Sequence, residues 1–246
     1  MIQFQRTALL IGEEGIRKLQ KSRVAVIGLG GVGSYAVEAL VRAGVGSFLI
    51  IDFDRVNESN INRQLIALHS TIGQLKTDVI KQRILDINPD VQIEILSEFF
   101  AQDNRLDYLK SADFILDAID SIGPKMGMIK DLTELEIPFI SVLGAGNRLD
   151  PSKIEITSIW KTEQCPLARR LKKLLRRYGV SKSFPVVFSN EKPIDLDFIE
   201  PPSPNDTRPD SIPKTTVGSI SYMPAIMGMM AASWLIRRIV YGEEFS

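Results

Sequence analysis

The sequence predicts an α/β protein with a Rossmann-like, doubly wound and mostly parallel sheet and a smaller C-terminal half. Short apolar runs alternate with amphipathic segments over the first 150 residues, which is typical of strands alternating with helices. The first apolar run, VAVI, leads directly into the glycine-rich stretch GLGGVG. A length of 246 residues also fits one large domain better than two equal ones.

The elements follow one another in a regular order. An amphipathic helix carrying Ile16 and Leu19 comes first, and a strand over 24–30 follows it. A helix over 34–44, a strand over 48–54, a helix over 76–88 and a strand over 91–98 continue the alternation. Two more strands are expected over 114–120 and 138–144, with a helix between them. Short β-branched and aromatic runs bounded by Gly or Asp are typical of buried parallel strands, so we expect helices on both faces of the sheet.

The character of the chain changes near Asp150. We therefore expect a single domain with a nucleotide-binding half over 1–150 and a substrate-binding and dimer-forming half over 151–246. Strands are expected over 153–159 and 185–189, with a helix over 168–179 between them. Residues 190–211 are rich in proline and acidic residues and predict a mobile crossover loop. The apolar run over 220–236 is marginally long enough to cross a bilayer, but its Pro224 and small residues favour a buried helix packed against the sheet.

Composition and charge exclude several classes of protein. Thirty basic residues balance thirty acidic ones, and 44% of the residues are hydrophobic, as in an ordinary soluble globular protein. Any contact with nucleic acid must therefore come from a local patch. A single cysteine excludes a disulfide framework and zinc sites built from paired CxxC motifs, and the N-terminus lacks a secretory cleavage site. We expect a cytoplasmic protein that does not insert into a membrane.

The stretch GLGGVG predicts a nucleotide-binding turn because it lies between a strand and a helix. Gly28 permits the tight turn, Gly30 lets a phosphate approach the backbone, and Gly33 lets the helix pack closely. The N–H groups at the start of the helix attract anionic phosphates. Asp52, at the end of the next strand, is placed to accept hydrogen bonds from ribose hydroxyls. These features suit NAD and ATP equally well.

The residues after Asp52 favour a triphosphate over NAD. The stretch DFDRVNESNINRQ adds a second acid, several amides and a cation, and GQLKTD adds a further cation; the candidate nucleotide-binding residues here are Asp54, Asn60, Arg63, Gln64 and Lys76. Cations and amides beside a phosphate-binding turn stabilise the charge that moves onto a leaving pyrophosphate. NAD has no such requirement.

One more acidic residue is expected in the same crevice. Asp120, at the end of the strand predicted over 114–120, would point toward the ligand and bind a metal ion. Each candidate also has a purely structural interpretation. Arg63 could form a surface ion pair, Lys76 could lie on a solvated helix face, and Asp120 could cap the next helix.

Several stretches resemble a known superfamily. GLGGVGS, DFDRVNESNINRQ, the lysine of GQLK and DAIDS are similar to the adenylating domain of the enzymes that activate ubiquitin and the sulfur-carrier proteins of molybdopterin and thiamin synthesis. RTALLIG, DAIDSIGPK, GAGNRLDPSKIEIT, CPLARRLKKL and GSISYMPAIMGMMAASWLI resemble, within this superfamily, the bacterial tRNA threonylcarbamoyladenosine dehydratases. The resemblance extends over nearly the whole chain.

The resemblance implies a role for each matching residue. Gly30 and its neighbour Gly31 would cradle ATP, Asp52 would bind the ribose, and Asp120 would bind Mg²⁺. The phosphates would be held by Asn60, Arg63 and Lys76. The resemblance also implies a homodimer in which Arg6 reaches the triphosphate bound to the partner subunit, so that Arg63, Lys76 and Arg6 are the expected catalytic residues.

The resemblance further implies an ATP-dependent dehydratase. Its substrate would be the carboxylate of threonylcarbamoyladenosine in tRNA, which would be adenylated and then cyclised with release of AMP and pyrophosphate. Because a nitrogen of the same side group closes the ring, no protein nucleophile is needed. Cys165, the only thiol, is therefore expected to be structural, although the basic residues after it could lower the pKa of a thiolate nucleophile.

Other functions stay open at this point. The principal alternative is an adenylyltransferase for a sulfur-carrier protein, which would have a carrier or sulfur-transfer protein as partner. The missing CxxC pairs argue against it. An NAD-linked oxidoreductase and a non-catalytic nucleotide-binding scaffold are further alternatives.

A basic amphipathic segment is the candidate surface for tRNA. The stretch ARRLKKLLRRYG has no acidic residue, its leucines form an apolar stripe, and its candidate nucleic-acid-binding residues are Arg169, Arg170, Lys172, Lys173, Arg176 and Arg177. Such a face suits contact with a phosphate backbone. A solvated helix face and an anionic membrane contact are the alternatives, and no DNA partner is expected.

Overall fold

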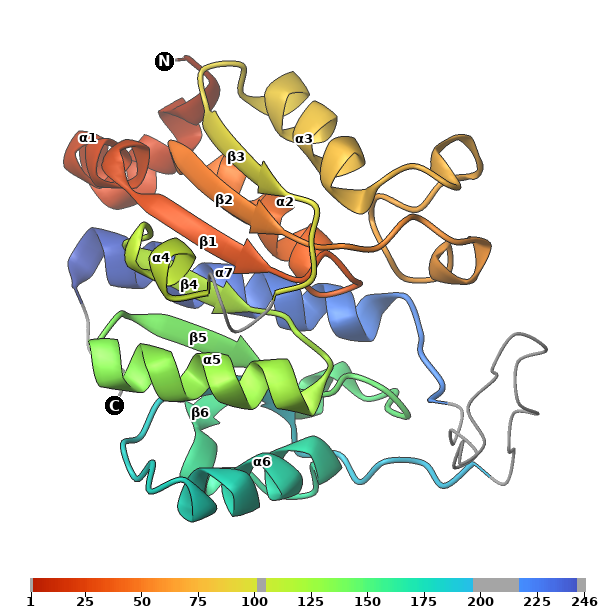
Figure 1. Ribbon diagram of the computed structural model, residues 1–246. Coiled ribbons are helices and arrows are strands. Elements are labelled where there is room, and N and C mark those ends of the chain that lie inside the picture. Colours follow the sequence, from red (N-terminus) through yellow and green to blue (C-terminus); the bar gives the residue numbers. More distant parts are fainter. Residues whose placement is uncertain (1, 101–104, 197–216, 243–246) are drawn as a thin grey trace.

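A single seven-stranded sheet forms the centre of the protein (Figure 1). The computed structural model describes residues 2–100, 105–196 and 217–242. The strands are β1 (Arg23–Ile27), β2 (Ser47–Ile51), β3 (Gln92–Leu96), β4 (Phe114–Asp117), β5 (Phe139–Val142), β6 (Ile154–Ser158) and β7 (Pro185–Ser189), in the spatial order β3-β2-β1-β4-β5-β7-β6. Only β6 runs antiparallel to its neighbour. The predicted α/β class with a mostly parallel sheet is confirmed.

Helices cover both faces of the sheet. They are α1 (Gln5–Lys21), α2 (Gly33–Ala43), α3 (Lys76–Ile87), α4 (Arg105–Lys110), α5 (Ile122–Leu135), α6 (Pro166–Arg177) and α7 (Tyr222–Tyr241). Helices α1, α2, α3 and α7 share one hydrophobic core with one face of the sheet, while α4, α5 and α6 share a second core with the other face. In Figure 1, α5 lies in front of the sheet and α7 behind it.

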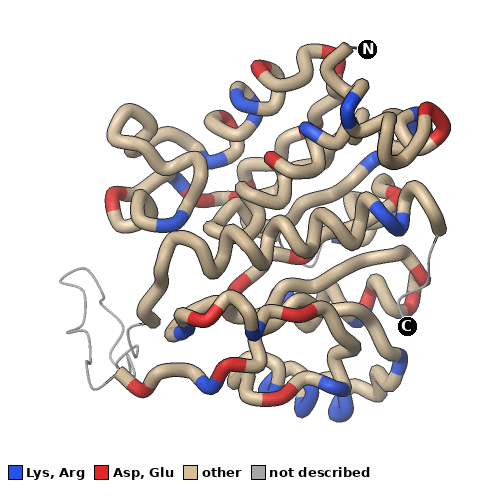
Figure 2. The backbone as a smooth tube through the Cα atoms, turned by 180° about the vertical axis from the view of Figure 1, so that it is seen from behind, with Lys and Arg blue, Asp and Glu red and all other residues tan. Residues whose placement is uncertain are grey.

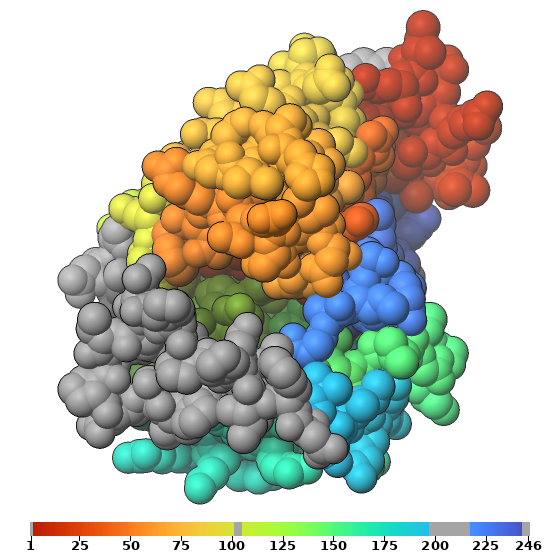
Figure 3. All heavy atoms as spheres, turned by 90° about the vertical axis from the view of Figure 1, so that its right-hand side faces the viewer, coloured from red at the N-terminus to blue at the C-terminus, as the bar shows by residue number. Residues whose placement is uncertain are grey.

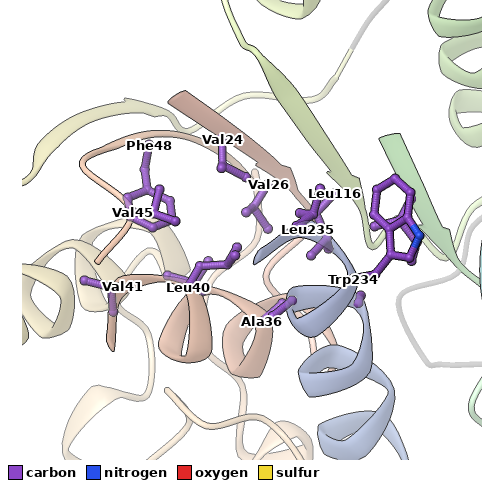
Figure 4. Close-up of a cluster of buried hydrophobic side chains, with 14 of the residues drawn as sticks. Val24, Val26, Ala36, Leu40, Val41, Val45, Phe48, Leu116, Trp234 and Leu235 are labelled. Carbon is purple, nitrogen blue, oxygen red and sulfur yellow. The ribbon is translucent and has the colours of Figure 1, made fainter. Parts of the chain in front are cut away.

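In the first core, α2 and α7 lie side by side on the same face of β1. Val24 and Val26 of β1 point toward Leu40 of α2 and Leu235 of α7 (Figure 4), and all four side chains are fully buried. Burying one such aliphatic side chain contributes about 1.5–3 kcal/mol. This packing fixes the start of α2, and with it the glycine turn that precedes α2.

Helix α7 is the apolar segment expected to be buried. Among the described residues it is the one helix long and apolar enough to cross a membrane, but more than half of its most apolar window is buried inside the protein. Its small residue Gly228 packs against α2, because a Cβ added there would lie 2.3 Å from the carbonyl oxygen of Val32. The prediction that this helix packs against the sheet is confirmed by its contacts with β5 and β7, and Gly228 in addition allows a close approach to α2.

The topology places a crevice beside β1 and β4. Strands β1 and β4 are neighbours in the sheet. From β1 the chain continues to β2 and β3 on one side, and from β4 it continues to β5 on the other side. The connections that leave β1 and β4 therefore cross opposite faces of the sheet. Ligands of wound parallel sheets bind at the carboxyl ends of the strands where the order reverses in this way. The glycine turn follows β1 and the segment 118–121 follows β4, so both meet at this edge.

Several element boundaries differ from those predicted. Strands β1, β2 and β4 end at Ile27, Ile51 and Asp117, each three residues before the predicted end. The backbone leaves the sheet earlier because the residues that follow form turns: Gly28 has a φ of +96°, and Asp117 Oδ1 accepts a hydrogen bond from the backbone N–H of Ile119. Helix α4 was not expected.

The C-terminal segments extend the same sheet. Strands β6 and β7 pair with each other, and β7 pairs with β5. The predicted mobile loop over 190–211 lies outside the described residues from 197 onward. Residues 190–196 are described, and a hydrogen bond of 2.8 Å from the backbone N–H of Ile194 to the carbonyl of Asn147 fixes their position.

Candidate functional site

The glycine turn lies at the carboxyl end of β1. A Cβ added at Gly28 would lie 2.8 Å from the carbonyl oxygen of Ala118, and one added at Gly33 would lie 1.8 Å from the carbonyl oxygen of Gly28. Both positions therefore require glycine. At Gly30, in contrast, no described atom comes within 4 Å of an added Cβ, so the backbone there borders open space. Gly31 lies between Pro224 of α7 and the carbonyl of Arg63.

Asp52 is the buried acid beside this turn. Its Oδ2 accepts a hydrogen bond from the backbone N–H of Leu29 over 2.6 Å, and its Oδ1 accepts one from the backbone N–H of Asp54 over 2.7 Å. Burial raises the pKa of the Asp52 carboxyl, and the nearby Lys76 ammonium and the two N–H donors oppose that rise. The carboxylate thus links the glycine turn to the segment after β2.

Lys76 begins α3 but does not lie on a solvated face. Its side chain is 5% exposed, and its Nζ lies 2.7 Å from Asp54 Oδ2. The solvated-face interpretation is therefore wrong. Lys76 and Asp54 both line the cavity, so the ammonium borders the space that an incoming anion would enter.

The segment between β2 and α3 supplies the amides and the second cation. Asn57 and Asn60 cap a 3-10 turn, with Asn60 Oδ1 accepting from the backbone N–H of Asn57. Arg63 Nη1 donates to the carbonyl of Ser59 over 2.9 Å and to Asn62 Oδ1 over 2.8 Å. Its partners are neutral oxygens, so the surface ion pair considered for Arg63 is not present among the described residues.

Gln64 has an unsatisfied polar atom beside the cavity. Its side chain is 7% exposed, and its Oε1 has no hydrogen-bond partner among the described residues. Buried side-chain oxygens are nearly always hydrogen-bonded. Gln64 therefore has acceptor capacity left for a donor group of a ligand.

Asp120 lies in the connection between β4 and α5. Its side chain is exposed, and its Oδ1 accepts from the Ser121 hydroxyl over 3.1 Å. The residue before the first turn of α5 is Ser121, and its side chain makes no capping hydrogen bond. The interpretation of Asp120 as a helix cap is therefore wrong, and its carboxylate remains free to face a ligand.

Beneath Asp120 lies a buried network that sequence reasoning missed. Lys125 Nζ lies 2.7 Å from Asp117 Oδ2 and donates to the carbonyl of Ile119 over 2.9 Å. The Ser141 hydroxyl donates to Asp117 Oδ2 over 2.6 Å. Asp117 and Lys125 are both fully buried. Asp117 Oδ1 accepts from the backbone N–H of Ile119, and Lys125 donates to the carbonyl of the same residue. These two hydrogen bonds fix the segment that carries Asp120. The sequence feature that could have indicated this network is Lys125 itself, a lysine among the mostly apolar residues at the start of α5.

A cavity of 960 Å³ lies at this edge of the sheet. It brings together ten of the predicted residues: Gly28, Gly30, Gly31, Asp52, Asp54, Asn60, Arg63, Gln64, Lys76 and Asp120. Gly33 lies behind the turn and does not line it. Figure 3 looks onto this side of the molecule, where the orange residues between β2 and α3 overhang a recess. Phe53 and Phe99, whose rings meet edge to face at 5.2 Å, form part of its rim and were not predicted.

Two predicted groups lie away from the cavity of their own chain. Arg6 is exposed on α1 and does not line it. The basic residues of α6 lie on the outer surface, along the lower edge in Figure 2. Within the described part of the chain none of them forms an ion pair, but Lys172 Nζ donates to the carbonyl of Thr162, and the Arg176 guanidinium lies 5.4 Å from the centre of the Trp160 ring. Lys172 is therefore partly withdrawn from the surface.

Cys165 is placed as a structural residue would be. It precedes α6, its side chain is 3% exposed, and it packs in the second hydrophobic core. No group of three or more His, Cys, Asp or Glu side chains that could hold a metal ion occurs in the described ranges. A metal ion at this site would therefore take most of its ligands from phosphates and water.

The fold and the cavity define a nucleotide-binding α/β protein whose site carries the cations that a triphosphate requires. The chain belongs to the ThiF family, whose model matches residues 4–245. It is 39% identical over 244 residues to the tRNA threonylcarbamoyladenosine dehydratase of Bacillus subtilis (strain 168), covering 98% of this chain and 96% of that one.

A solved structure and a more distant relative are also similar to this chain. The crystal structure of the E. coli tRNA N6-threonylcarbamoyladenosine dehydratase TcdA in complex with ATP superposes with a TM-score of 0.87 at 32% identity, covering 98% of this chain and 95% of that one. The E. coli (strain K12) sulfur carrier protein ThiS adenylyltransferase is 34% identical over 152 residues, which is 60% of this chain and 61% of that one. Similarity to the dehydratases thus extends over the whole chain, and similarity to the carrier-activating enzyme does not.

Proposed function

We propose that this protein is an ATP-dependent enzyme that adenylates the carboxylate of threonylcarbamoyladenosine in tRNA and then closes it to a ring. The observation that carries the proposal is the cavity, which joins the open backbone at Gly30 to the cations of Arg63 and Lys76. The full-length similarity to tRNA threonylcarbamoyladenosine dehydratases supports the same reaction. The similarity to carrier-activating enzymes covers less of the chain, so that alternative is not favoured.

The reaction has two chemical steps. In the first, a carboxylate oxygen attacks the α-phosphorus of ATP, an acyl–AMP bond forms, and pyrophosphate leaves. In the second, a nitrogen of the same side group attacks the activated carbonyl carbon, loses its proton, and AMP leaves. The second step is intramolecular, and proximity alone accelerates such steps strongly. This is consistent with a buried Cys165 that has no catalytic task.

The chain's own residues would position the nucleotide and stabilise charge. The Asp52 carboxylate would accept hydrogen bonds from the ribose. Arg63 and Lys76 would stabilise the negative charge that accumulates on pyrophosphate as it leaves. Removing one preorganised charged donor of this kind costs roughly 10²–10³ in rate. The side-chain amide of Asn60 would donate to the same phosphates, and Gln64 Oε1 would accept a hydrogen bond from a donor group elsewhere on the ligand.

Mg²⁺ fits the residues present. Magnesium in nucleotide sites is held by one or two carboxylates together with phosphates and water rather than by a cage of protein ligands. The exposed Asp120 carboxylate at the cavity is one such ligand. When bound, the ion would neutralise part of the phosphate charge.

The tRNA would lie on the basic face of α6. Arg169, Arg170, Lys173, Arg176 and Arg177 are exposed there, and Leu167 of the same helix lines the cavity. A phosphate backbone on this face would bring a nucleotide of the RNA to the mouth of the site. A cytoplasmic location would suit this substrate.

A homodimer would complete the site. Arg6 is exposed and outside its own cavity, and Leu9 and Leu10 on the same helix are 86% and 83% exposed. We propose that α1 packs against the partner subunit, with Arg6 directed to the triphosphate bound there.

AMP release tests the proposed function. Purified protein is incubated with ATP, Mg²⁺ and bulk tRNA from cells that do or do not install threonylcarbamoyladenosine. We expect AMP and pyrophosphate only with the modified tRNA. Equal turnover with unmodified tRNA, or turnover only with a sulfur-carrier protein, would overturn the proposal.

A further inference from the structure

The cavity is large for a ligand site and has two chemically different sides. Its volume of 960 Å³ lies at the upper end of the range of about 300–1,000 Å³ for such sites. The nucleotide side carries the charged and amide residues described above. The opposite side, which we call the neutral wall, consists of residues 142–146 together with Leu167, Val217 and Ser219. None of these wall residues is charged.

The neutral wall is held in place by its own hydrogen bonds. The Asn147 backbone N–H donates to the carbonyl of Gly218 over 2.8 Å, and Asn147 Oδ1 accepts from the Gly218 N–H over 2.6 Å. Arg148 is 4% exposed, and its Nη1 donates to the carbonyls of Gly144 and Gly146 over 2.8 and 3.1 Å. The wall is therefore shaped before any ligand binds.

We propose that the neutral wall binds the acceptor of the adenylation, a carboxylate-bearing side group on a modified adenosine of an RNA strand. This inference rests on the proposed function. The acceptor's carboxylate would approach the α-phosphate from the side opposite the pyrophosphate that Arg63 and Lys76 hold. The uncharged remainder of the group would lie along the wall, where no charged group would have to be desolvated.

Continuity with the basic helix identifies the acceptor as part of an RNA. Leu167 of the wall belongs to the first turn of α6, and the exposed cations Arg169 and Arg170 follow it directly on the same helix. RNA bases that are modified or read by proteins are commonly turned out of the stack into a pocket while the backbone is held outside. The wall and α6 provide these two surfaces side by side.

Gly144 is the wall position that limits the size of the acceptor. A Cβ added at Gly144 would meet only the Leu167 Cβ, at 4.0 Å, and the Gly144 backbone does not have a positive φ. A larger side chain is therefore compatible with the backbone, and it would fill the space between the wall and α6. At Gly146, in contrast, a Cβ would lie 2.0 Å from Val217 Cγ1 and would disturb the wall itself.

A size series at Gly144 tests the proposal. The variants are Gly144→Ala and Gly144→Leu, with Gly123→Leu as the matched control, because Gly123 is exposed on α5, does not line the cavity, and a Cβ there meets nothing within 4 Å. The measurements are the KM for modified tRNA and kcat from AMP release at saturating ATP, and the Kd for ATP by calorimetry.

We expect Gly144→Leu to raise the KM for modified tRNA or to lower kcat by roughly tenfold or more, since a few misplaced methylenes in a pocket change selectivity by that factor. Gly144→Ala should fall between Gly144→Leu and the unsubstituted protein, and the Kd for ATP should change less than about twofold in all variants. Gly123→Leu should match the unsubstituted protein.

Two results would overturn the inference. One is a Gly144→Leu variant with unchanged kcat and KM for tRNA, and the other is an equal loss of ATP affinity, which would place Gly144 on the nucleotide side. These results can be distinguished from a failure of the proposed function. In that case the unsubstituted protein itself would release no AMP with modified tRNA. Turnover with a sulfur-carrier protein instead would assign the wall to a peptide carboxylate and would also overturn the inference.

Discussion

Lys76 Nζ lies 2.7 Å from Asp54 Oδ2, and this pair joins the first residue of α3 to the segment after β2 at the edge of the cavity. The lysine side chain is 5% exposed, whereas that of Asp54 is 47% exposed. The ammonium has thus already left bulk water in the folded protein, and Asp54 offsets that cost. A triphosphate that replaces Asp54 as partner would gain a cation that needs no further desolvation.

Replacing Lys76 tests its contribution to the reaction. Lys76→Met should lower kcat for AMP formation by roughly 10²–10³, because a preorganised cation facing the leaving pyrophosphate is lost. Lys81→Met is the matched control, since Lys81 is exposed on the same helix and does not line the cavity. A Lys76→Met variant with normal kcat but lowered thermal stability would assign the lysine a structural role only, and would contradict its role in catalysis.

Breaking the buried Asp117–Lys125 pair should destabilise the protein strongly. Lys125→Met leaves Asp117 buried without its cation, and removing one partner of such a pair costs about 3–5 kcal/mol. Denaturant unfolding measures this loss. Lys130→Met on the same helix removes only an exposed pair with Glu134 at 3.7 Å and should cost less than about 1 kcal/mol. The double variant Asp117→Asn/Lys125→Met should be more stable than Lys125→Met alone, and the reverse order would contradict this explanation.

The stability of the protein should depend on pH through Asp52. Burial raises the pKa of this carboxyl above its ordinary value of 3.8, so the folded state binds the proton more tightly than the unfolded state does. The contribution is therefore fully present below pH 3.8 and is lost as the pH rises through the raised pKa. Measured from acidic to neutral pH, the free energy of unfolding should fall relative to that of Asp52→Asn and then level off. A relative rise with pH would mean that the Lys76 ammonium outweighs burial.

Neutralising the basic face of α6 should weaken tRNA binding and its salt dependence together. Each phosphate contact that is lost lowers the slope of log K against log salt by about 0.7–0.9, so the triple variant Arg169→Gln/Arg170→Gln/Lys173→Gln should lower it by about 2–3. Lys182→Gln is the control, because Lys182 already pairs with Glu136 at 2.7 Å. Filter binding at several salt concentrations gives both slopes. An unchanged slope in the triple variant would show that α6 is only a solvated face.

Mixing two inactive variants tests whether Arg6 acts on the partner's site. Arg6→Ala and Lys76→Met are each expected to be inactive as homodimers. In a mixed dimer, the subunit with an intact Lys76 receives Arg6 from its partner, so random exchange should restore about a quarter of full activity. Subunit exchange is verified with two differently tagged variants. If the mixture stays inactive although mixed dimers have formed, Arg6 does not act on the partner's site.

The local features of the site could be predicted from the sequence. The glycine turn, the acidic Asp52 at the cavity and the amide-rich segment after it are set by residue types at short separations, and such patterns act through the chemistry of neighbouring residues. The pattern of apolar and amphipathic segments is equally local, and it predicted all seven strands and the position of α6. The ends of the strands were less predictable, because turns such as that of Gly28 begin before the apolar run is exhausted.

What the sequence determined by itself is therefore the class of fold and the chemistry of the nucleotide side. Only the tertiary structure decided that Lys76 is buried against Asp54, that Lys125 reaches Asp117, and that residues 142–146, Leu167 and Val217 form one wall. These relationships join segments that are far apart in the chain, or depend on which face of a helix is covered. The meeting of the glycine turn with residues 142–146 follows from the order β1-β4-β5 in the sheet, because that order brings the carboxyl ends of these parallel strands to one edge.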